Sequence, residues 1–163
     1  MTALNSRQPS SVVGIAFVKT VTLTLDTSIY ASGDVLADLT QVADMVRADG
    51  AAILIQSVTV LDKDAQGIEM DLVISPYAKS LGTLNAGVSI SDADAEGLQR
   101  IANIASTDYA SLGSGSKIAT KSGIGLMVQA AAGSSKLYIG AITRGTPTHT
   151  AAGIVLQIGY AAA

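Results

Sequence analysis

The chain has 163 residues, no cysteine, a formal net charge of −3, and 14% charged residues against a usual value of about 25%. At this length one domain buries about 70% of the surface of its unfolded chain, so stability requires neither disulfides nor a structural metal. The acidic balance argues against nucleic-acid binding, and no apolar run reaches the ~20 residues of a membrane helix.

Side chains that could do chemistry are scarce, since the chain has one histidine, His149, and no cysteine. Catalysis needs polar groups with shifted pKa values that converge in a pocket. The mean hydropathy is +0.43, whereas soluble monomers rarely expose large apolar patches. We therefore expect a non-enzymatic structural protein that hides apolar surface in a subunit contact. The alternative is a monomer whose alanine- and glycine-rich surface raises the mean hydropathy.

The N-terminal residues 1–11 are polar and offer no apolar anchor, so we expect a flexible arm. They also lack the apolar core of a secretory signal. A single β-sandwich domain is expected over 12–163.

The first strand is predicted over 18–26, where Val21, Leu23 and Leu25 alternate with threonines. A turn follows at 30–34, with Gly33 at positive φ. Further strands are expected at 42–47, 53–62, 68–75, 117–120, 124–130, 137–143 and 154–160.

Two of these runs carry additional expectations. The strand at 53–62 begins almost continuously apolar, as a strand covered on both faces would. The polar turn 62–67 then predicts a hairpin with 68–75, which Pro76 ends. In the last strand, Ile154, Leu156 and Ile158 should be buried, and an interior position is expected because no charge protects an open edge.

One short helix is expected near 92–104. Ser91 can cap it, with Asp94 three residues later, and Leu98, Ile101, Ala102 and Ala105 could form one helix face. Roughly eight or nine short strands with connections of unequal length favour an all-β, two-sheet β-sandwich of jelly-roll type.

The candidate metal sites are weak. Asp62, Asp64, Gln66 and Gly67 resemble the start of an EF-hand loop, but Val73 stands where the closing glutamate belongs. A polar hairpin turn is the better interpretation. The acids Asp92, Asp94 and Glu96 more commonly complement a helix N-terminus than bind a metal.

The other candidate motifs also favour structural roles. The segment 113–117 lacks the full phosphate-loop pattern and reads as a hairpin loop. His149 is expected at the surface of a threonine-rich turn, because no G-x-S-x-G motif accompanies it. The five tyrosines are expected at core edges or interfaces. We therefore expect no catalytic, cofactor-binding or metal-binding residue.

Several segments together resemble small tailed-bacteriophage virion proteins. Residues 29–36 contain the Tyr-x-x-Gly-Asp-Val turn found near the start of many such proteins. Residues 137–150 followed by 154–159 are similar to their closing pair of strands, and 58–67 and 88–94 match the middle of the family. The resemblance covers most of the chain after the arm, and it rests on the order in which these motifs follow one another.

Within this group the chain is similar to capsid decoration (cement) subunits. The resemblance implies a β-sandwich, often trimeric, on the outside of the phage head, with the major capsid protein as partner. Such a protein would be made in the bacterial cytoplasm. The contact residues expected are Arg7, Gln8, Pro9, Leu156 and Tyr160.

Two other functions remain open at this point. A glycan-binding or head-fibre or tail attachment module on the virion surface would need a pocket in which Asp, Asn and an exposed tyrosine converge. A hydrolase would need His149 beside a serine and a carboxylate in a cleft.

Overall fold

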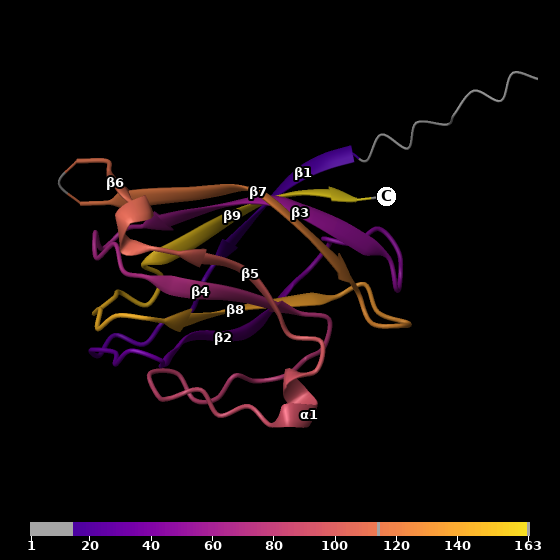
Figure 1. Cartoon of the computed structure of the whole chain (residues 1–163), viewed down its shortest axis with the longest axis horizontal. Helices are drawn as coiled ribbons and strands as arrows, with labels where there is room; N and C mark the ends of the chain where they lie inside the picture. Colours follow the sequence, from indigo (N-terminus) through magenta and orange to yellow (C-terminus); the bar gives the residue numbers. More distant parts are fainter. Residues whose placement is uncertain (1–14, 114, 163) are drawn as a thin grey trace, which may run out of the picture.

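The computed structural model describes residues 15–113 and 115–162. Nearly all of its regular structure is strand (Figure 1). The strands are β1 (Ile15–Thr22), β2 (Val35–Val42), β3 (Ala52–Asp62), β4 (Met70–Ser75), β5 (Gln99–Ile104), β6 (Ala110–Ser111), β7 (Lys117–Gln129), β8 (Leu137–Thr143) and β9 (Ile154–Ala162). The helices are α1 (Asp92–Ala95) and a 3-10 turn at Ser106–Asp108.

The strands form two antiparallel sheets with the orders β1-β9-β3-β7-β6 and β2-β8-β4-β5. β1 pairs with β9, β2 with β8, β3 with β7 and β4 with β5. These nested pairs describe one long antiparallel ribbon wound into two layers, which is the jelly-roll order. The predicted all-β jelly-roll sandwich is therefore confirmed.

The predicted hairpin between β3 and β4 is wrong, because the two strands lie in different sheets. The same holds for β8 and β9, the expected closing pair. In each case a short loop carries the chain from one sheet to the other. Turn residues mark where a chain reverses, but they do not determine which sheet receives the next strand.

β9 lies between β1 and β3, as expected for an interior strand, and Ile154, Leu156 and Ile158 are fully buried. The strand predicted at 42–47 is wrong. Most of that segment is a turn region after β2, in which Asp44 has a φ of 59°.

The predicted helix ends after one turn. Ser91 caps α1 as expected, since its side chain accepts a hydrogen bond from the Asp94 N–H. The residues that follow form β5 instead. A register shift in the β4–β5 ladder brings both Ile101 and Ile104 into the core. The bulge thus imitates the i, i+3 spacing of a helix.

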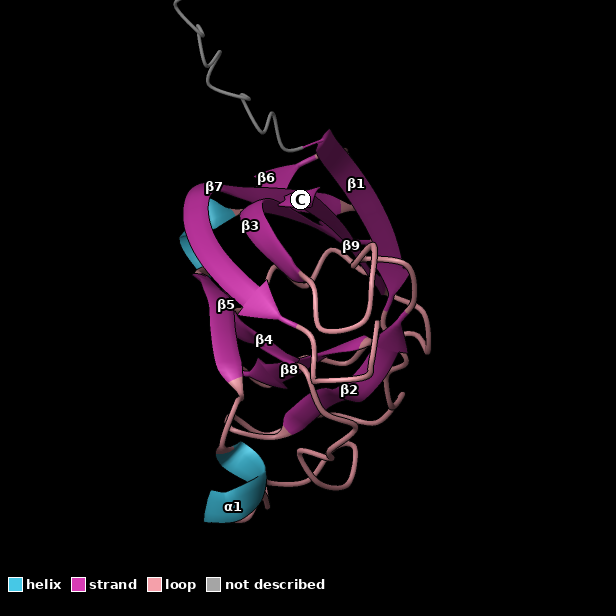
Figure 2. Cartoon of the chain, turned by 90° about the vertical axis from the view of Figure 1, so that its right-hand side faces the viewer, coloured by secondary structure: helices cyan, strands magenta, loops and turns pink. Residues whose placement is uncertain are grey.

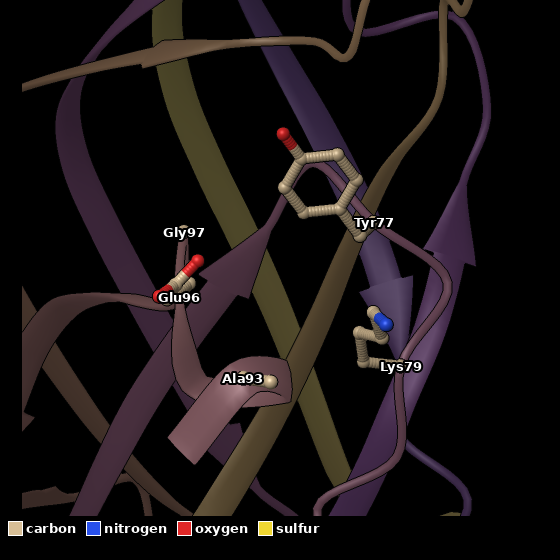
Figure 3. A pocket seen from close by; sticks show the side chains of 5 residues that line it. All are labelled: Tyr77, Lys79, Ala93, Glu96 and Gly97. Carbon is tan, nitrogen blue, oxygen red and sulfur yellow. The ribbon is translucent and has the colours of Figure 1, made fainter. Parts of the chain in front are cut away.

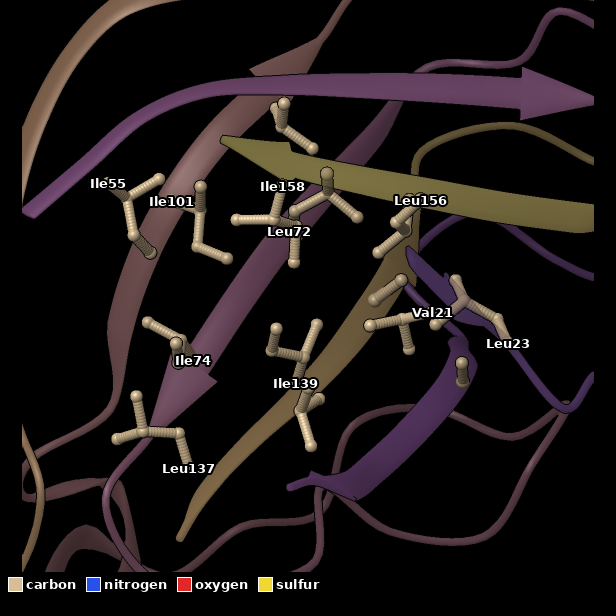
Figure 4. Packing of buried hydrophobic residues seen from close by; sticks show 14 of the residues in the cluster. Val21, Leu23, Ile55, Leu72, Ile74, Ile101, Leu137, Ile139, Leu156 and Ile158 are labelled. Atoms are coloured by element: carbon tan, nitrogen blue, oxygen red, sulfur yellow. The ribbon is translucent and has the colours of Figure 1, made fainter. Parts of the chain in front are cut away.

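The core lies between the two sheets and consists mainly of aliphatic side chains from both (Figure 4). β3 alternates between buried and partly exposed residues, so the expectation that it is covered on both faces is wrong. β4 is buried along its whole length. On its outer side Val73 belongs to a second cluster with Val35 of β2 and Leu81, and further apolar residues of the 76–98 segment pack against this cluster.

The 76–98 segment and α1 lie at the side of the molecule opposite the β1-β9-β3-β7-β6 sheet (Figures 1 and 2). Within the described residues, no helix has the length and apolar character needed to cross a membrane.

Candidate functional site

The outward-facing residues of the larger sheet carry no charge. Neighbours in the strand ladders share a face, and the positions between the buried residues form four cross-strand rows. We call this surface the outer face. Its rows are Thr22, Val155, Leu61 and Ile118; Thr20, Gln157, Thr59 and Thr120; Val18, Gly159, Ser57 and Ser122; and Ala16, Ala161, Leu54 and Met127.

The outer face combines short hydroxyl side chains with exposed apolar ones. Val18 is 70% and Met127 67% exposed. The hydroxyls of Thr59 and Thr120 hydrogen-bond across the strands at 2.9 Å. A solvent-facing sheet normally carries charged side chains that keep it soluble and oppose association. A face without them is a candidate subunit contact.

The smaller sheet carries charge on its exposed part. Asp71 in β4 accepts hydrogen bonds from Arg144 at 2.8 Å and from Asn103 at 3.1 Å, and it pairs with Arg100. Burial raises the pKa of Asp71, but the Asn103 and Arg144 hydrogen bonds and the arginine charges outweigh burial and hold that pKa below its usual value. The two sheets therefore present different surfaces, one charged and one neutral.

His149 is buried, with a 2% exposed residue surface, so its expected surface position is wrong. It lies in the β8–β9 loop against the β3–β4 loop, where its Nδ1 is 3.3 Å from Asp64 Oδ2 and 3.9 Å from Asp62 Oδ1. Its Nε2 has no hydrogen-bond partner among the described residues. The meeting of two loops distant in sequence brings these groups together.

The carboxylates of this cluster are already occupied. Asp62 accepts the N–H groups of Asp64 at 3.0 Å and Gly67 at 2.6 Å. Asp64 accepts the N–H of Thr150 at 2.8 Å and its hydroxyl at 3.1 Å. The cluster therefore fastens the two loops to each other, and the predicted polar turn at 62–67 becomes a link between the sheets.

The electrostatics of the cluster agree with this structural role. Burial raises the pKa of Asp64, but hydrogen bonds from Thr150 and His149 outweigh burial and hold it below the usual 3.8. Burial also raises the pKa of the nearby Tyr109 hydroxyl, as do the charges of Asp62 and Asp108.

The three donors Asp62, Asp64 and His149 lie within 4.8 Å of one another, a spacing that could suit a divalent metal. Two observations favour the loop contact over a metal centre. The carboxylate oxygens of Asp62 and Asp64 already accept hydrogen bonds from N–H and O–H groups. A metal-binding histidine normally donates its second ring N–H to a partner, but Nε2 of His149 has no such partner among the described residues. A catalytic triad would require a serine hydroxyl hydrogen-bonded to His149, and among the described residues His149 has no such bond.

We expect chelation to leave the stability of the protein unchanged. With the oxygens satisfied internally, removal of divalent ions should not alter the melting temperature measured by circular dichroism in EDTA. Calcium, manganese and zinc added back separately serve as the comparison. A fall of several degrees in EDTA that one of these ions reverses would show that the cluster is a metal site.

The sequence-predicted contact residues fall into two groups. Arg7, Gln8 and Pro9 lie outside the described residues, as does the whole expected arm. Leu156 is 0% and Tyr160 5% exposed, so their side chains belong to the sandwich interior and present no surface to a partner. The signal for the outer face was in the neighbouring positions, where Val155, Gln157 and Gly159 alternate with the buried residues.

The structure also places the 113–117 segment and the tyrosines, for which the sequence predicts structural roles. β6 and β7 are antiparallel neighbours in which Ser111 lies opposite Lys117, so Lys117 is already part of a strand and the predicted hairpin loop connects two paired strands. Among the tyrosines, Tyr30 and Tyr160 are buried, whereas Tyr77 is 46% exposed and borders a pocket.

No protein-family model and no curated protein matches the sequence. Among solved structures, one of the Gx strain of infectious bursal disease virus aligns with 99% of this chain at 13% identity and a TM-score of 0.22. The VP2 subviral particle of that virus aligns with 91% at 14% identity and a TM-score of 0.20. The chain spans 41% of each of those chains.

Proposed function

We propose that this protein is a non-enzymatic structural subunit of a bacteriophage virion that binds the assembled head and reinforces it. The observation that carries the proposal is the uncharged outer face, on which Val18 and Met127 stand exposed. The jelly-roll order and the resemblance of several sequence motifs to small tailed-bacteriophage virion proteins support the same function.

In this proposal the subunit is made in the bacterial cytoplasm and assembles as a homotrimer on the outer surface of the head. The major capsid protein is its partner. Each subunit contributes a modest contact, and a trimer engages several sites at once, which raises the effective concentration without a strong single contact. A neutral sheet suits this use because docking it requires no desolvation of charged groups.

The outer face can be tested with one conservative change. Gln157 is exposed in the middle of this face, between Thr20 and Thr59. Gln157→Glu adds a charge with almost no change in volume, and a carboxylate desolvated without a partner weakens a contact strongly. We expect at least about a tenfold loss, or about 1.4 kcal/mol, in assembly or in binding to heads. Light scattering measures assembly, and co-sedimentation with heads that lack the protein measures binding.

Gln41→Glu is the matched control, because Gln41 is also exposed but lies in β2 of the other sheet. Both variants should melt like the parent at a dilution where all three proteins are monomeric, since neither side chain is buried in the free subunit and only association would otherwise shift the melting temperature. The proposal is contradicted if Gln157→Glu assembles and binds heads like the parent, or if Gln41→Glu weakens both equally.

A further inference from the structure

A pocket of about 300 Å³ opens between the segment that follows β4 and the helix α1. Its lining residues are Tyr77, Lys79, Ala93, Glu96 and Gly97. In Figure 3 the tyrosine ring, the Glu96 carboxylate and the Lys79 ammonium border one open space. This volume is at the small end of ligand sites. It matches one sugar-sized unit better than a nucleotide or a folded peptide.

The ring of Tyr77 is held in place although it is 46% exposed. The Tyr77 N–H donates to the Ser75 hydroxyl at 3.0 Å. The ring packs directly over Gly97, where an added Cβ would lie 2.9 Å from Tyr77 Cε2. Gly97 also has a φ of +83°, a backbone conformation that residues with a side chain rarely adopt. An exposed aromatic face that is already ordered loses little further entropy when a ligand stacks on it.

The charges around the pocket disfavour anions. Lys79 forms an ion pair with Asp94, which also bonds to the Ser91 hydroxyl. Glu96 forms no ion pair among the described residues. Because Asp94 neutralises Lys79, the carboxylate of Glu96 is the lining charge that no ion pair compensates. It would repel a phosphate, sulfate or sugar acid, whereas the hydroxyl groups of a neutral ligand can donate to it.

We propose that this pocket binds a neutral saccharide unit. The C–H face of the sugar ring stacks on Tyr77, one or two hydroxyls donate to the Glu96 carboxylate, and the Lys79 ammonium donates to a sugar oxygen. The α1 segment, which contributes to the pocket lining, lies on the side of the molecule opposite the larger sheet that carries the outer face (Figure 1). A subunit docked through the outer face would leave the pocket open to solvent, where several copies could bind a glycan surface together.

The test is a titration of the ¹⁵N-labelled full chain with glucose, galactose, mannose and N-acetylglucosamine, followed by amide chemical shifts. At least one sugar should give saturable shifts at Tyr77, Lys79 and Gly97, with a Kd of about 1 to 10 mM, the range of a contact worth about 3–4 kcal/mol. Tyr77→Ala should weaken that binding at least about tenfold, and Tyr77→Phe should retain most of it. Glu96→Gln should also weaken it.

Asp92→Asn is the matched control for Glu96→Gln, because Asp92 is an exposed acid at the start of α1, the helix that Glu96 ends, and it does not line the pocket. It should bind like the parent. The inference is overturned if none of the four sugars gives saturable shifts up to about 100 mM, if Tyr77→Ala binds like the parent, or if inorganic phosphate alone shifts these amides. The measurement uses the free protein, so its result is independent of capsid binding.

Discussion

Replacing Leu156 with aspartate is expected to prevent the chain from folding. Leu156 is fully buried in β9, where it lies opposite Val21 of β1 and Val60 of β3 in the two ladders. A carboxylate there would have no partner, and burying it costs more than about 4–5 kcal/mol. That loss is comparable to the whole stability of a small domain, about 5–15 kcal/mol. Circular dichroism and urea unfolding of the purified variant measure the result.

Gln157→Asp is the control for this change, because it adds the same carboxylate one residue later on the exposed side of the strand. It should fold with a stability within about 1 kcal/mol of the parent, as surface changes usually do. A soluble Leu156→Asp protein that unfolds cooperatively at the midpoint of the parent would show that the orientation of β9 is wrong.

Replacing Gly153 with alanine should weaken the contact between the β3–β4 and β8–β9 loops, which the cluster of Asp62, Asp64 and His149 (the histidine cluster) joins. A Cβ at Gly153 would lie in contact with the Asp64 carboxylate and 3.2 Å from the Thr150 carbonyl oxygen. Asp64 would have to turn away and lose its bonds to Thr150 and His149. We expect a loss of about 2–3 kcal/mol, which corresponds to a fall of about 4–12 °C in melting temperature.

Gly87→Ala is the matched control, since Gly87 is also a loop glycine without positive φ, and an added Cβ there meets no atom within 4 Å. It should change the melting temperature little. If Gly153→Ala and Gly87→Ala melt alike, the contact between Asp64 and the β8–β9 loop contributes nothing to stability.

The pH dependence of stability in the parent and in Gly153→Ala provides a second measurement of this contact. The folded-state pKa of Asp64 is held below 3.8. Its hydrogen bonds therefore contribute stability at pH values above the unfolded-state pKa, and this contribution is lost as the pH falls through the folded-state pKa. The difference in unfolding free energy between the parent and Gly153→Ala should therefore be present at neutral pH and shrink below pH 3.8. An undiminished difference in acid would assign it to steric strain at Gly153.

The sequence could not locate the histidine cluster. Asp64 and His149 are separated by 85 positions, and each lies in a stretch that resembles an ordinary polar turn. A lone histidine among threonines is usually exposed, because imidazole is costly to bury without partners. Here the partners come from another loop, so no local pattern could reveal them. The pocket beside Tyr77 was missed for the same reason, since the α1 segment completes it.

The strand β5 shows how local spacing can mislead. Ile101 and Ile104 are three residues apart, which favours a helix, yet a bulge against β4 turns both toward the core. The register of a strand depends on its partner, so this irregularity is absent from the strand's own sequence.

The sequence by itself determined the all-β class, the positions of most strands, the turn at Gly33, the cap at Ser91 and the buried face of β9. These features depend on alternation, turn residues and capping, which act between residues close in the chain. Only the tertiary structure decided that β3 and β4 separate into different sheets, that β4 is the strand covered on both sides, and that the outer face is continuous and uncharged. Each of these depends on which distant strands become neighbours, and that choice is made when the two sheets pack around a common core.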